Sequence, residues 1–271
     1  MTERSEHNRP QVIRSPRFSI RWSAELLWSF VSQRITLRYK ESLLGFGWIF
    51  LQPVALTIIF SYIRRIANIP TGEIPYPLFV AIGLVGWSFT ALAISQSVPS
   101  ISNYSALLKR TAFPRIVLPL SSIIATLADF GIMLFLVLAL CLYTHHLSVW
   151  GLFWIPILLL IHFMLLIGIG CLVSLINVFL RDVGHATPHL LQFWFFASPV
   201  FYPFSMVPKE FKELSRWNPM TGLLEGYRSV LVYGQPPPLD LFLPAFLVAV
   251  ATCALGLSCF WHLEGSVADM L

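Results

Sequence analysis

The sequence predicts an all-α integral membrane protein with six transmembrane helices, an N-terminal amphipathic interface helix and re-entrant external helices before the last span. Two features of the composition support this fold class. Hydrophobic residues make up 56% of the 271 positions and charged residues only 11%, whereas about a quarter of a soluble domain is charged. The hydrophobic residues also gather into runs of about 20, the length that crosses a bilayer as a helix.

The chain begins with a polar, basic stretch, residues 1–17, that we expect to form a cytoplasmic tail. No small-residue cleavage site follows a short apolar core, and so we expect the N-terminus to be retained. Residues 18–40 place Trp22, Leu26 and Phe30 at helical spacing with cations between them. This pattern predicts a helix in the membrane interface, although a soluble helix packed on a partner would show it too.

Six apolar runs then define a membrane bundle, 46–262, within a single domain, 1–271. The spans are expected at 46–66, 77–98, 117–141, 151–179, 188–206 and 241–262. Between the last two spans, the segment 207–240 is too apolar for a plain loop and too interrupted by proline for a span. Short helices that re-enter the outer leaflet satisfy both constraints, provided that protein or a water-filled cavity covers the broken backbone.

The distribution of cations predicts the orientation of the bundle. If the N-terminus is inside, the loops near 99–116 and 180–187 are cytoplasmic, and the cytoplasmic segments hold twelve of the 18 lysines and arginines against six outside. By the positive-inside rule we expect both termini in the cytoplasm. The adjacent membrane argues against nucleic acid as the partner of these charges and favours anionic membrane lipids.

The chain lacks the motifs of several enzyme classes. No Gly-Lys pair opens a phosphate-binding loop, and so we do not expect this chain to hydrolyse ATP. Neither a Gly-x-Ser-x-Gly elbow nor a His-Glu-x-x-His helix is present. His185 and His189 have a spacing that can hold a metal, but no cysteine accompanies them, and no metal site is expected.

Two kinds of residue in the spans are candidates for a transport path. Asp129 is the one acid deep in an apolar run, where its insertion costs about 2.5–3.5 kcal/mol, and so it should face the bundle interior. It lies on a substrate path or bonds a neighbouring helix. Aromatic residues in the first and fifth spans either fill packing gaps or line a conduit along which sugar rings slide. These aromatic residues are Phe60, Tyr62, Trp194, Phe195, Phe201 and Tyr202.

Short motifs spread over nearly the whole chain resemble the ABC-2 type permeases that export lipid-linked polysaccharides such as O-antigens and teichoic acids. The motifs include Gln52-Pro53, Pro75-Tyr76-Pro77, Phe113-Pro114-Arg115, Arg181-Asp182, Ser198-Pro199-Val200 and Asn218-Pro219-Met220. The resemblance implies a permease subunit in a bacterial cytoplasmic (inner) membrane. It further implies a homodimer that joins two copies of a separate ABC ATPase subunit. The chain itself would need no cofactor, since ATP and Mg²⁺ would bind the ATPase.

The resemblance also implies which residues form the sites. A short helix of about 102–115 is expected to insert into a cleft on the ATPase, with cations at an acidic rim, Phe113 in a pocket and Pro114 fixing the turn. The expected coupling residues are Leu108, Lys109, Arg110, Phe113, Pro114 and Arg115. The path between two copies would be lined by the six aromatic residues and Asp129, and re-entrant helices would gate its external end. The expected gate residues are Trp217, Asn218, Pro219, Glu225, Tyr227 and Arg228.

Two other functions stay open on the sequence alone. An ABC-2 permease for a small lipid or drug would show a narrow lateral pocket instead of an aromatic-lined channel. A membrane-embedded glycosyl or acyl transferase would bring acids or histidines together at one membrane depth, and only Asp129 is deep.

Overall fold

The computed structural model describes residues 20–40, 47–67, 69, 74–109, 111 and 113–270. The expected tail, 1–17, lies outside these residues. The elements are α1 (Ile20–Lys40), α2 (Gly47–Ala67), α3 (Tyr76–Ser97), η1 (Ser102–Tyr104), α4 (Ser105–Leu108), α5 (Val117–Tyr143), η2 (Trp150–Trp154), α6 (Ile155–Phe179), α7 (Asp182–Ala197), η3 (Phe204–Met206), α8 (Lys209–Trp217), α9 (Pro219–Arg228), η4 (Ser229–Tyr233) and α10 (Leu239–Met270).

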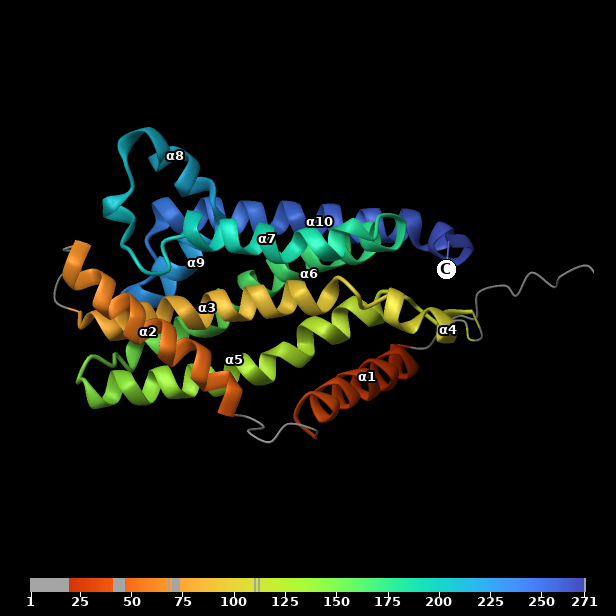
Figure 1. Ribbon diagram of the computed structural model, residues 1–271, viewed down its shortest axis with the longest axis horizontal. Coiled ribbons are helices and arrows are strands. Elements are labelled where there is room, and N and C mark those ends of the chain that lie inside the picture. Colours follow the sequence, from red (N-terminus) through yellow and green to blue (C-terminus); the bar gives the residue numbers. More distant parts are fainter. Residues whose placement is uncertain are drawn as a thin grey trace, which may run out of the picture.

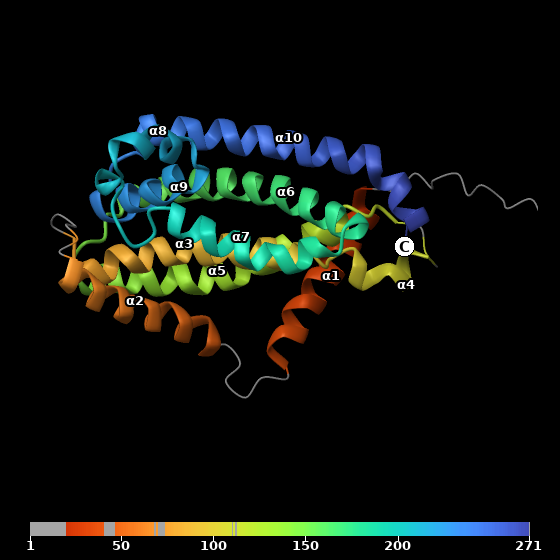
Figure 2. The ribbon, with the colours of Figure 1, turned by 45° about the horizontal axis from the view of Figure 1, so that its top comes forward.

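The long helices form one elongated bundle with different short elements at its two ends (Figure 1). The short helix α4 and the last turns of α10 lie at one end, which we call the α4 end. The short helices α8 and α9 lie at the other end, which we call the α9 end (Figure 2). The short helices expected within 207–240 are thus present, as α8, α9 and η4.

Within the described ranges, five helical segments are long and apolar enough to cross a membrane, and they match five of the six predicted spans. They fall on α2, α3, α5, η2 with α6, and α10. The remaining predicted span, 188–206, falls on α7, which begins at Asp182 and ends at Ala197 and is therefore about 24 Å long. Pro199 explains the early end, since a proline disfavours helical backbone at the preceding residue, and Ser198 is extended with φ −106° and ψ 144°. Six complete crossings stay a prediction.

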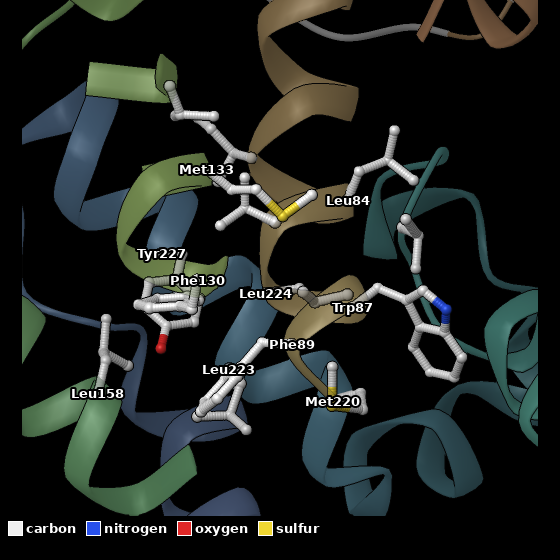
Figure 3. Close-up of a cluster of buried hydrophobic side chains, with 14 of the residues drawn as sticks. Leu84, Trp87, Phe89, Phe130, Met133, Leu158, Met220, Leu223, Leu224 and Tyr227 are labelled. Carbon is white, nitrogen blue, oxygen red and sulfur yellow. The ribbon is translucent and has the colours of Figure 1, made fainter. Parts of the chain in front are cut away.

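The core of the bundle is organised around α3. This helix is the most enclosed of the five, since 72% of the residues in its apolar segment are buried. It packs against α5, α6 and α9. Met220 and Leu224 of α9 belong to one buried cluster with Leu84 and Trp87 of α3 (Figure 3). Helix α9 is therefore an interior element of the bundle, and its re-entry into the outer leaflet stays a prediction.

Helix α1 packs beside α5 instead of lying only at the edge of the bundle. Phe30 and Val31 are buried, and the Arg34 Nε group donates a hydrogen bond to Ser121 Oγ over 3.1 Å. One turn further along α1, Arg38 forms an ion pair with Asp129. Because Ser121 and Asp129 are separated by about 12 Å along α5, α1 follows α5 toward the middle of the bundle.

Candidate functional site

The α9 end is built around a non-helical connection, residues 198–203, that joins α7 to η3. A broken helix frees backbone carbonyls, and in an apolar setting each of them needs a partner. Three side chains supply hydrogen bonds: Arg228 Nη2 donates to Val200 O (2.7 Å), the Tyr76 hydroxyl to Phe201 O (2.8 Å) and Asn218 Nδ2 to Ala197 O (3.2 Å). Side chains of the protein therefore satisfy two carbonyls of the connection and one at the end of α7.

Asn218 joins the end of α7 to the start of α9. Its Oδ1 accepts hydrogen bonds from Trp194 Nε1 (2.9 Å) and from the backbone N–H of Met220 (3.1 Å), and so it caps α9. Its Nδ2 also donates to Ser198 Oγ over 3.0 Å. The side-chain amide of Asn218 thus uses its donor and acceptor atoms to hold α7, the 198–203 connection and α9 together.

Arg228 is the most deeply buried cation among the described residues, with 1% of its surface exposed. Its guanidinium pairs with Glu225 Oε1 (2.9 Å) and lies 3.6 Å from the centre of the Phe79 ring. Glu225 Oε1 also accepts the backbone N–H of Phe204 over 3.3 Å. Burial lowers the pKa of Arg228, and the neighbouring Glu225 carboxylate opposes that shift. The pair ties α9 to α3 and to both ends of the 198–203 connection.

The close approach of α3 to this cluster depends on Gly83. A Cβ atom at this position would lie 2.5 Å from Val200 O and 2.7 Å from Arg228 Nη2.

Gly83→Ala is therefore expected to lower the free energy of unfolding by about 1–3 kcal/mol, the usual cost of overpacking. Thermal denaturation of the purified protein in detergent measures this change. Gly131→Ala is the control, because a Cβ there meets no atom within 4 Å, and equal melting temperatures for the two variants would contradict the prediction.

Five of the seven expected channel residues come together beside this connection. Phe60 stacks on Phe201, with ring centres 4.6 Å apart and planes at 3°, and Phe195 and Tyr202 pack on the same ring. Of the five, Trp194, Phe201 and Tyr202 border a cleft of about 890 Å³ between the ends of α2 and α7 and the segment 206–219, and Phe60 and Phe195 pack behind Phe201. Its walls are aromatic and aliphatic, with the gate residues Trp217, Asn218 and Pro219 along one side.

The other two expected channel residues lie elsewhere. Tyr62 is 68% exposed on the outer surface of α2, whereas Phe60 on the same helix is buried. Asp129 is 5% exposed and bound to Arg38 of α1. Of the two roles open to Asp129, the structure shows the bond to a neighbouring helix.

The interior also holds a polar cluster that the sequence analysis did not identify. Thr90 Oγ1 lies 2.7 Å from His162 Nε2, and the other ring nitrogen of His162 lies 3.4 Å from the Tyr227 hydroxyl. Tyr227, expected at the external gate, is instead 2% exposed beside Phe130 (Figure 3). The cluster joins α9 to α3 and α6. The one signal for it was that His162 is the only histidine within the apolar run 151–179.

At the α4 end, the expected coupling segment forms a turn instead of one continuous helix. We call residues 102–115 the coupling turn; η1 and α4 make up its first half, and Arg110 lies outside the described residues. Lys109 is exposed and Leu107 is 37% exposed, while Leu108 and Pro114 are half-buried. The exposed tip is therefore made by Leu107 and Lys109, and Leu107 was not among the expected contacts.

The structure corrects the expected role of Phe113. Its side chain is 8% exposed and packs with Phe30, Val117 and Leu118, with ring centres of Phe30 and Phe113 6.0 Å apart. The ring was expected to fill a pocket on a partner, and it fills one inside its own chain because α1 covers it. Arg115 is half-buried as well and contacts α10. Sequence reasoning missed Phe30 and α10 as neighbours of the turn because both lie far away along the chain.

The sequence is similar to known membrane transport proteins along most of its length. The family model described as "ABC-2 type transporter" matches residues 25–232, which include the coupling turn and the α9 end. The O-antigen export system permease protein RfbA of Myxococcus xanthus is 30% identical over 231 residues, covering 83% of this chain and 87% of the relative. A protein of the same description from Klebsiella pneumoniae is 25% identical over 260 residues, covering 94% and 98%. The polysialic acid transport protein KpsM of Escherichia coli is 23% identical over 208 residues, covering 74% and 79%.

Proposed function

Since the chain belongs to the ABC-2 type transporter family, we propose that it is the permease subunit of an ABC exporter that moves a lipid-linked polysaccharide across a bacterial inner membrane. A separate ATPase subunit would drive it. The names of the relatives support the substrate class, because they are described as permease or transport proteins for O-antigen and polysialic acid.

The observation that carries the proposal is the aromatic cleft at the α9 end. Non-helical backbone at membrane depth is tolerated where it is enclosed by protein or lines a water-filled cavity, and residues 198–203 meet this condition. The cleft beside them is bordered by Phe201, Tyr202 and Trp194. Aromatic faces can stack on the apolar faces of sugar rings without fixed hydrogen bonds, and so they suit a polymer that must slide.

The charges support an orientation with the α4 end in the cytoplasm. Lys109 and Arg115 of the coupling turn and Arg181, between α6 and α7, all lie at this end. The basic N-terminal residues precede α1, and α1 contacts the first turns of α5, which begin next to the coupling turn. By the positive-inside rule the α9 end then faces outward, where an exporter needs its exit gate.

The tip of the coupling turn is the proposed contact with the ATPase. Leu107 presents an apolar side chain and Lys109 a cation, next to a turn whose inner side is fixed by Phe113 and Arg115. An exposed apolar side chain beside a cation suits an interface with an apolar centre and a polar rim. The ATPase would thus engage the tip while the inner residues hold it in place.

A second copy of the chain is proposed to cover the outer face of α2. Only 6% of the residues in the apolar segment of α2 are buried, and Tyr62, Ile58 and Leu51 are among its exposed residues.

A cysteine in place of Tyr62 is expected to form a cross-linked dimer in membranes. A cysteine in place of Leu255, which is 60% exposed on α10 across the bundle, is the control. Equal cross-linking at both positions would contradict an α2 interface.

Reconstitution tests the proposed function. The chain and an ABC ATPase encoded with it would be placed in proteoliposomes that contain a lipid-linked polysaccharide on the ATPase side. We expect the polymer to become accessible to a glycosidase on the opposite side only when both proteins and hydrolysable ATP are present. Movement of short lipids without movement of the polymer would support a small-lipid permease instead. Chemical turnover of the lipid-linked sugar by the chain alone would support a transferase.

A further inference from the structure

Glu264, near the end of α10, holds the coupling turn through two hydrogen bonds. The backbone N–H of Arg115 donates to Glu264 Oε1 over 2.8 Å, and the Arg115 guanidinium donates to the backbone carbonyl of Glu264. The two residues are 149 positions apart in sequence. Each thus binds a backbone group of the other, and the attachment fixes the main chain of the turn as well as a side chain.

An apolar contact on the same face of α10 adds to this attachment. Phe260, one helical turn before Glu264, is fully buried in a cluster with Ile101 at the start of the turn. Leu108 and Ile116 pack against that cluster. The segment from Ile101 to Ile116 therefore shares a buried cluster with α6 and α10 and is hydrogen-bonded to α10 at Arg115.

Helix α10 packs closely against α6 along the bundle. A Cβ atom at Gly256 would clash with the backbone of Gly168, and one at Gly168 would clash with the backbone of Thr252. The two helices therefore meet backbone to backbone, the close approach that small residues allow in membranes. A displacement applied at Glu264 cannot be taken up by loose side chains at this crossing.

The other end of α10 carries helix α9. A Cβ atom at Gly222 would clash with the Leu241 carbonyl and lie 2.7 Å from the Ala245 Cβ. Helix α9 bears Glu225 and Arg228, which bind the 198–203 connection. From Ala245 to Glu264, α10 spans about 30 Å. One helix thus contacts the coupling turn at the α4 end and the gate at the α9 end.

We propose that Glu264 is a positioning residue that locks the coupling turn onto α10, and that α10 transmits the displacement of the turn to α9. The proposal rests on the proposed function, since it assigns a route for the work of the ATPase. It differs from a charge contact with the ATPase, because the Glu264 carboxylate accepts a backbone N–H within its own chain.

The variants Glu264→Gln and Glu264→Ala distinguish a role in positioning the coupling turn from a charge contact with the ATPase. A glutamine oxygen can still accept the Arg115 N–H, whereas alanine has no acceptor. We expect Glu264→Gln to keep the wild-type amount of polymer exported per ATP hydrolysed in proteoliposomes. We expect Glu264→Ala to lower that ratio about tenfold while the ATPase stays bound and active. His262→Ala is the control, because the His262 ring is exposed and its hydrogen bond is within its own helix turn, to Ser258 O.

Hydrogen–deuterium exchange of the complex gives a second, direct measurement. The amide of Arg115 should lose protection in Glu264→Ala and keep it in Glu264→Gln. Wild-type coupling and protection in the alanine variant would overturn the proposal, as would a glutamine variant as defective as alanine. Either of these two contradicting results would leave the proposed function as an exporter permease unaffected. Absence of export by the wild-type complex would instead remove the proposed function.

Discussion

Replacing Leu107 with aspartate and Lys109 with glutamate is expected to abolish polymer export while the permease stays folded. Both side chains are exposed at the tip of the coupling turn, and so the change costs little within the chain. At a docking surface, however, loss of an apolar anchor and reversal of a charge each remove about 2 kcal/mol or more of binding free energy. Binding of the ATPase should therefore weaken by on the order of 1,000-fold.

Surface polymer and co-purification of the ATPase with the tagged permease measure this effect. Lys209→Glu, which makes the same charge change on an exposed residue at the α9 end, serves as the control. Wild-type export by the double variant at 107 and 109 would show that the tip of the turn is not the docking surface.

Arg228→Leu is expected to give the largest loss of stability among single changes at the gate. The substitution leaves the Glu225 carboxylate and the Val200 carbonyl without the cation that binds them inside the protein. Breaking a buried ion pair in this way costs about 3–5 kcal/mol. The effect should appear as a large drop in melting temperature together with loss of export.

The chain offers a matched comparison for this prediction. Arg216 pairs with Glu213 at the same three-residue spacing, but the two side chains are 37% and 72% exposed. Arg216→Leu should change the free energy of unfolding by less than about 1 kcal/mol. The double variant Arg228→Leu with Glu225→Leu should recover part of the stability, because no charge is then left unpaired. Equal effects of Arg228→Leu and Arg216→Leu would contradict the role given to the buried pair.

Much of the fold followed from the apolar pattern, because the bilayer restricts the choice so strongly. Runs of about 20 apolar residues have one structural solution in lipid, and five of the predicted spans are confirmed as helices. The prolines of 207–240 likewise predicted short helices, and α8 and α9 are present. The fifth span was placed too far along the chain because its apolar residues continue past Pro199, where the backbone cannot stay helical.

The contacts of the site were harder to predict, because they join residues far apart in sequence. Asp129 looked like an isolated acid, but its partner Arg38 lies 91 positions away on a helix that was expected at the edge of the membrane. Phe113 looked like an anchor for a partner, and only the position of α1 shows that it is already covered. The contacts of Glu264 and His162 were not predicted, because neither residue belongs to a local motif. A local pattern reports which face of a helix is apolar, but not which element covers it.

We expect ATP used at the α4 end to open the α9 end. The most direct test of this opening is the labelling of a cysteine in place of Ser198, which is buried in the gate, by a membrane-impermeant maleimide added from outside. The reconstituted complex would carry no other reactive cysteine in the permease. We predict that labelling becomes faster when ATP is added and that the variant at Leu107 and Lys109 loses this response. An equal rate with and without ATP in the wild-type complex would contradict the account.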